Sequence, residues 1–162
     1  MNIQTIMQAL QDTALATFIR ESGSAFPTLE SVHVIGIALV FGTIAVVDLR
    51  LLGVASHRKS ALRLIHELLP FTWVAFLVCV ITGSLMFISN AITYSENILF
   101  WWKMGLLALA GLNMAVFHLG VYRRIDEWDT TLPPPAQARI AGLGSMVLWV
   151  GVIALGRWIG FL

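Results

Sequence analysis

Four long stretches of the chain are almost entirely apolar, and short polar stretches separate them. They cover about residues 28–54, 61–88, 97–122 and 139–161. A helix needs roughly 20 mostly apolar residues to cross the hydrocarbon core of a bilayer, and each stretch is long enough. Backbone groups in lipid must be paired within their own segment, so the stretches are expected to be helices. The pattern predicts an all-α fold, in which residues 21–162 form a single four-transmembrane-helix bundle.

Residues 1–20 follow a different pattern, in which apolar positions recur at helical spacing with polar residues between them. The apolar positions are Ile3, Ile6, Met7, Leu10, Ala14, Leu15 and Phe18. This pattern favours an amphipathic helix that lies flat in the membrane interface. The segment lacks the basic start and the long apolar core of a cleaved signal peptide, so none is expected.

The charges in the connections predict the orientation of the bundle. The first connection contains His57, Arg58 and Lys59, and the third contains the Arg123–Arg124 pair. The second connection, residues 89–97, has no lysine or arginine. Because basic loops remain on the cytoplasmic side, the first and third connections are expected in the cytoplasm. The second connection and both termini are then on the outer side.

The composition supports a membrane protein and excludes a nucleic-acid partner. The chain is 58% hydrophobic and 12% charged, whereas soluble domains are about a quarter charged. Its net charge of +1 creates no strong field toward nucleic acid. Cys79 is the only cysteine, so no intramolecular disulfide can form, and its apolar surroundings indicate a small buried side chain.

Two histidines are predicted at similar depth near the cytoplasmic side, His66 on the second helix and His118 on the third. Ionisable groups at membrane depth are costly, which makes each a candidate for function. If these helices pack together, the two imidazoles can act as axial ligands on opposite faces of a haem b. Its propionates would find cations at the same surface, namely Arg50, Arg63, Arg123 and Arg124. Alternatively, both histidines bond to nearby carbonyls or reach into the interface.

A second polar cluster is predicted near the outer side, made of Glu30, His33, Lys103 and Arg157. One interpretation is a structural ion-pair network that locks the bundle. Another is a polar pocket for a quinone or other small molecule, with Glu30 and His33 as a proton relay and the cations at a carbonyl. A third is a Cu(I) site, in which His33 is joined by Met86 or Met104.

Asp48 lies near the end of the first predicted helix, where its charge opposes the helix dipole. A cation partner is therefore expected, and Arg139 or Arg63 would serve. We interpret the Asp48–Arg139 pair as an inner structural clamp. Asn113, in the middle of the third helix, is expected to hydrogen-bond across helices. No Gly-rich phosphate loop, serine elbow or zinc-ligand spacing occurs, so no catalytic residue is assigned.

The chain resembles a family of small bacterial four-helix membrane proteins of unknown function. The resemblance is carried by PTLESVHVIGIALVFGTIAVVDLRLLG, HELLPFTWVAFLVCVITGSLMF, FWWKMGLLALAGLNMAVFH and SMVLWVGVIALGRWIGF. It implies a bacterial inner-membrane protein. More remotely, histidines on a four-helix bundle resemble cytochromes of the b561 kind and the copper-resistance protein CopD. The two-haem b561 proteins carry four intramembrane histidines, whereas this chain has three, because His57 lies in a connection. One haem at most is therefore expected.

These observations leave three functions open. The first is an electron-transfer protein with haem b near the cytoplasmic side, and a quinone or a redox partner protein at the outer side. The second is a copper or small-solute transport component, which would need a homo-oligomer because four helices offer a thin pathway. The third is a non-catalytic membrane subunit whose charges only specify helix packing.

Overall fold

The computed structural model describes residues 2–55, 59–129 and 133–161, and the described part is built from helices. The four longest are α3 (Ala25–Leu51), α4 (Ala61–Ser89), α6 (Ile98–Leu119) and α8 (Ala136–Trp158). All four predicted spans are confirmed as helices that are long and apolar enough to cross a membrane. This fold is compatible with a multi-pass membrane protein.

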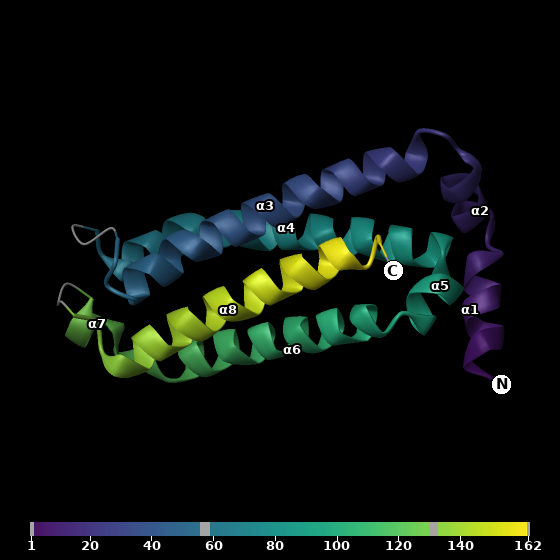
Figure 1. Ribbon diagram of the computed structural model, residues 1–162. Coiled ribbons are helices and arrows are strands. Elements are labelled where there is room, and N and C mark those ends of the chain that lie inside the picture. The colour runs from purple at the N-terminus through teal and green to yellow at the C-terminus, as the bar shows by residue number, and fades with distance from the viewer. Residues whose placement is uncertain (1, 56–58, 130–132, 162) are drawn as a thin grey trace.

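The four long helices do not pack evenly around an axis (Figure 1). Helix α3 packs along α4 and also against α8, and α6 packs along α8. Two glycines allow these contacts to be close. A Cβ atom on Gly36 would lie 2.7 Å from Cys79 Sγ of α4, and one on Gly142 of α8 would lie 3.1 Å from the Asp48 carbonyl oxygen. Helices α4 and α6, the second and third spans, make no comparable contact within the described part of the chain.

One end of the bundle, here called the basic end, carries the connections that follow α3 and α6. The second of these contains a 3₁₀ helix, η1 (Val121–Arg124), and the short α7 (Ile125–Trp128). A buried apolar cluster closes this end, formed by Leu51, Ala61, Ile65, Phe117, Ile125, Trp128 and Ala138. His57 of the first connection lies outside the described residues.

The opposite end, here called the terminal end, carries both chain termini (Figure 1). The amphipathic segment is confirmed as helical, but it forms two helices instead of one, α1 (Ile3–Gln11) and α2 (Ala14–Glu21). Thr13 separates them because its hydroxyl accepts the Ala16 N–H, which makes Thr13 the N-cap of a new helix. A further short helix, α5 (Ala91–Glu96), joins α4 to α6 and contacts α1.

Candidate functional site

A cavity of about 290 Å³ lies among the four long helices, in the half of the bundle nearer the basic end. It exists because α4 and α6 do not pack against each other. All four helices contribute to its largely apolar wall, including Val40, Thr43 and Asp48 from α3, Leu69, Thr72, Trp73 and Phe76 from α4, Met114, Phe117 and His118 from α6, and Ser145 and Trp149 from α8. We call this cavity the cleft.

The cleft opens sideways, between α4 and α6. A second hollow shares Leu69, Trp73, Met114 and His118 with it and adds Ala115. These residues form the mouth, where 49% of the Trp73 surface is exposed. Toward the basic end, three residues of the wall, Leu51, Ile65 and Phe117, belong to the buried apolar cluster. The cleft is therefore reached from the side of the bundle, a surface that faces lipid when the helices span a membrane.

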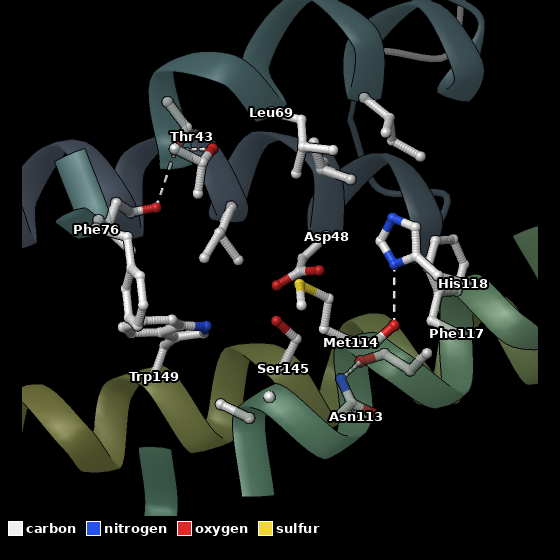
Figure 2. Close-up of a pocket in the computed structure, with 18 of the residues that line it drawn as sticks. Thr43, Asp48, Leu69, Phe76, Asn113, Met114, Phe117, His118, Ser145 and Trp149 are labelled. Carbon is white, nitrogen blue, oxygen red and sulfur yellow. Dashed lines mark hydrogen bonds between the residues drawn. The ribbon is translucent and has the colours of Figure 1, made fainter. Parts of the chain in front are cut away.

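Asp48 is the polar centre of the cleft. Its side chain points into the cavity between Met114 and Ser145, and the Ser145 hydroxyl faces the carboxylate (Figure 2). Only 4% of Asp48 is exposed, and its Oδ2 atom has no hydrogen-bond partner among the described residues. Burying a carboxylate without a compensating partner is expensive, so this arrangement is a candidate for function.

The structure does not form the predicted Asp48–Arg139 clamp. Arg139 is exposed in the first turn of α8, and Asp48 instead faces Ser145, six residues further along that helix. Arg63, the other predicted partner, pairs with Glu67 at 2.7 Å. Within the described residues, Asp48 has no ion pair. The helix-dipole argument identified Asp48 as a residue that needs a partner, but it does not specify which face of α3 carries the carboxylate.

A different pair of residues clamps the basic end. Arg50 is 1% exposed, and its Nε donates to the Lys59 carbonyl at 2.8 Å while its Nη2 donates to the Asp129 carbonyl at 2.6 Å. The Asp129 carboxylate in turn accepts the Leu62 N–H at 2.9 Å, at the start of α4. Arg50 and Asp129 thus tie the first and third connections together. The sequence signal for this role was the position of Arg50 near the C-terminus of α3, where a cationic side chain can donate to backbone carbonyls.

Both predicted haem ligands contact Tyr122, a residue that was not predicted from the sequence. Tyr122 of η1 places its hydroxyl 3.2 Å from His66 Nε2, and its ring centre is 5.0 Å from that of His118. His118 Nδ1 lies 2.9 Å from the Met114 carbonyl oxygen, so this nitrogen donates and Nε2 keeps its lone pair in the neutral ring. The two histidines are brought to one region, with Tyr122 at both of them.

The four arginines proposed for propionates have different environments. Arg50 is enclosed in the clamp. Arg63 and Arg124 are exposed and pair with acidic neighbours on their own helical turns, Arg63 with Glu67 and Arg124 with Glu127 at 2.8 Å. Arg123 is exposed. The region around the two histidines therefore has exposed cations at its surface, but two of them already have carboxylate partners.

The four residues of the outer cluster form two pairs, a partly buried one (His33 and Lys103) and a surface pair (Glu30 and Arg157). His33 Nδ1 lies 2.8 Å from the Thr82 hydroxyl, and the half-buried Lys103 packs its ammonium over Gly156, where a Cβ would be 3.7 Å from Nζ. Glu30 and Arg157 are exposed. In the part of the chain that the structure describes, no ion pair joins these four residues.

The surface pair faces other groups. The Arg157 guanidinium lies 4.8 Å from the centre of the Phe161 ring. Burial and the nearby Glu30 carboxylate raise the pKa of the Tyr94 phenol in α5. Glu30 therefore lies near α5, which the sequence did not predict.

The sequence model described as "Family of unknown function (DUF6644)" matches residues 10–162, which is most of the chain. No curated protein and no solved structure matches.

Proposed function

We propose, for a chain that belongs to the family of unknown function DUF6644, a role as a membrane protein that binds a small, mainly apolar molecule in the cleft. One observation carries the proposal, namely a largely apolar cavity that opens between α4 and α6 and contains a single buried carboxylate. Small-molecule sites are mostly apolar hollows of about 300–1,000 Å³ with a few polar groups that orient the ligand. The cleft is at the lower end of this range, which favours a compact ligand.

The path into the cleft supports a ligand that dissolves in the bilayer. The mouth is formed by Leu69, Trp73, Met114, Ala115 and His118, which lie on parts of α4 and α6 that are long and apolar enough to span a membrane. A molecule in the acyl-chain region reaches this mouth without crossing water. The bundle would then act as a receptor or carrier component for a molecule that is already in the membrane.

The proposal includes an orientation in the bacterial inner membrane. The basic end carries Lys59, Arg63, Arg123, Arg124 and Arg139, so we place it in the cytoplasm and the terminal end outside. Fusing alkaline phosphatase, which is active only outside the cytoplasm, to the C-terminus should give an active reporter. An active reporter fused within residues 56–58 instead would reverse the assignment.

The binding test uses 4-bromotoluene, a compact apolar compound whose bromine quenches tryptophan fluorescence. Trp73 and Trp149 line the cleft, so binding should quench part of the fluorescence in a saturable way. Gly111 also lines the cleft, and a side chain there meets open space, so Gly111→Leu should fill the cavity without distorting the backbone.

The matched control is Gly105→Leu. Gly105 lies on the same helix and also has open space around it, but it does not line the cleft. Both variants add one leucine side chain to α6, so any effect of the added apolar surface on the probe's partitioning is the same in both. We expect saturable quenching in the wild type and in Gly105→Leu, and only a linear response in Gly111→Leu. Identical responses from the three proteins would refute binding in the cleft.

A haem-binding electron-transfer protein is a second candidate, favoured by the arrangement around Tyr122. A metal-bound histidine commonly donates its other ring N–H to a backbone carbonyl, as His118 does to Met114. The second ligand fits only if Tyr122 releases His66, because its hydroxyl lies 3.2 Å from His66 Nε2. When bound, a haem would supply one-electron chemistry, and the chain would hold and orient it.

The absorption spectrum of protein from haem-replete cells, before and after dithionite, tests this candidate. A haem b protein should show a Soret band and sharp reduced bands that disappear in His66→Ala and His118→Ala and persist in His33→Ala. Tyr122→Phe should keep them. A colourless, folded protein would refute this second candidate while leaving the cleft proposal intact.

A further inference from the structure

The buried carboxylate of Asp48 lacks the partner that a charged group requires at this depth. Its Oδ2 atom is buried without a hydrogen bond among the described residues, and the hydroxyl that faces the carboxylate, that of Ser145, is neutral. A carboxylate in such surroundings must take up a proton or be matched by a positive charge. Whether that positive charge belongs to the protein or to a ligand therefore bears on what the cleft binds.

The described part of the chain does not provide the cation. Arg50, two residues away, directs Nε and Nη2 to the Lys59 and Asp129 carbonyls, and its buried Nη1 makes no hydrogen bond within the described residues, to Asp48 or to any other group. Among the residues that line the cleft, α4 and α8 contribute no titratable side chain, and α6 contributes only His118. The His118 ring donates from Nδ1 to the Met114 carbonyl. A counter-charge for the ionised carboxylate is therefore expected from outside the described part of the chain.

We infer that the cleft takes a lipophilic organic cation, such as an amine or quaternary ammonium on an apolar body, whose charge pairs with Asp48. This inference rests on the proposed function and names the class of ligand. An anion is repelled by the carboxylate, and a purely apolar ligand leaves Oδ2 without a partner. A cation with an apolar body satisfies both the carboxylate and the wall.

The aromatic wall fits the same ligand class. Trp73, Phe76, Phe117 and Trp149 line the cleft, and their ring faces attract cations, more strongly where water is excluded. Without the ligand, Asp48 is neutral only when it holds a proton, so the cation and the proton compete for one carboxylate. Cation binding should therefore strengthen as the pH rises. His118 is the other titratable side chain among the residues that line the cleft, so the comparison includes His118→Asn.

The test compares two molecules of the same shape in competition with 4-bromotoluene, using the full chain in nanodiscs. Benzyltrimethylammonium carries a permanent charge, and neopentylbenzene is its neutral carbon analogue. In Asp48→Asn, we expect the affinity for the cation to fall by roughly tenfold or more relative to the affinity for neopentylbenzene, because a desolvated charge pair is lost. Asp48→Glu, which keeps the charge, should retain most of the cation's advantage.

A pH series provides a readout that needs no variant of Asp48. As the pH rises through the range in which Asp48 loses its proton, competition by benzyltrimethylammonium should strengthen and competition by neopentylbenzene should stay constant. The trend should persist in His118→Asn. The inference would be overturned if the pH trend disappears in His118→Asn, or if benzyltrimethylammonium competes equally well for wild type and for Asp48→Asn. Either outcome would leave the cleft proposal standing. Absence of saturable 4-bromotoluene quenching in the wild type would overturn both.

Discussion

The Arg50 guanidinium donates to the Asp129 carbonyl at 2.6 Å, which fastens the end of α3 to the connection that follows α7. The same guanidinium donates to the Lys59 carbonyl, so one side chain holds both connections of the basic end. Since the carboxylate of Asp129 also accepts the Leu62 N–H, the start of α4 belongs to the same unit. Among the described residues, the basic end is thus organised by hydrogen bonds to backbone atoms rather than by ion pairs between helices.

Removing the Arg50 guanidinium should destabilise the bundle more than removing any exposed arginine. Arg50→Met leaves two carbonyls without their charged donor, and we expect a loss of about 2–4 kcal/mol. Thermal unfolding in detergent, followed by circular dichroism, measures the effect. Arg139→Met is the control, because Arg139 is exposed, and it should have little effect. Equal unfolding temperatures for the two variants would contradict the clamp.

Gly36→Ala should separate α3 from α4. The new Cβ would lie 2.7 Å from Cys79 Sγ, closer than real Cβ atoms approach, and relieving such overpacking costs about 1–3 kcal/mol. The control is Gly42→Ala on the same helix, where a Cβ meets nothing within 4 Å. The double variant Gly36→Ala, Cys79→Ala should recover most of the stability. A double variant no more stable than Gly36→Ala would show that the Cys79 contact is not the cause.

Arg20→Ala should release the two N-terminal helices from the bundle without unfolding it. Arg20 Nη1 donates to the Gln11 carbonyl at 3.2 Å and to the Ser89 carbonyl at 3.1 Å, which joins α1, α2 and the end of α4. Limited proteolysis should cut near residues 12–13 several times faster in the variant, with the unfolding temperature of the bundle unchanged. Glu21→Ala, at an exposed position beside it, should be cut at the wild-type rate.

Lys103→Met should leave the stability unchanged or raise it by about 1 kcal/mol. Lys103 is half buried and has no ion pair within the described residues, so its ammonium is desolvated without compensation from a carboxylate. Chemical or thermal unfolding in detergent provides the measurement. A clear loss of stability would favour the ion-pair network that the sequence suggested, and it would mean that Glu30 reaches Lys103 in the membrane.

The positions of the spanning helices were predictable because each depends on a property of its own segment. Length and hydropathy locate α3, α4, α6 and α8 to within a few residues. The order of packing was not predictable in this way. Consecutive antiparallel helices usually pack together, yet α4 and α6 are separated by the cleft, with α4 packed on α3 and α6 packed on α8.

Individual contacts were likewise predictable in some cases and not in others. The interhelical role of Asn113 is confirmed, since its Nδ2 donates to the Ala141 carbonyl at 3.0 Å. The chain contains 13 glycines, and small residues in membrane helices favour close packing, but their number does not identify which of them take part. Gly36 and Gly142 lie at helix contacts, whereas Gly105 and Gly111 have open space beside them. Tyr122 was missed because the third span was predicted to run to residue 122, whereas α6 ends at Leu119 and the chain continues as η1, which brings Tyr122 to both histidines.

The lateral mouth of the cleft determines which concentration governs its occupancy. A ligand that arrives through lipid binds in proportion to its mole fraction in the bilayer, and the aqueous concentration matters only through partitioning. Each additional methylene group contributes about 0.8 kcal/mol to that partitioning, which is roughly fourfold in local concentration. Two homologous ligands with identical contacts in the cleft would therefore differ in apparent aqueous affinity. The intrinsic preference of the protein emerges only when binding is expressed per mole of lipid.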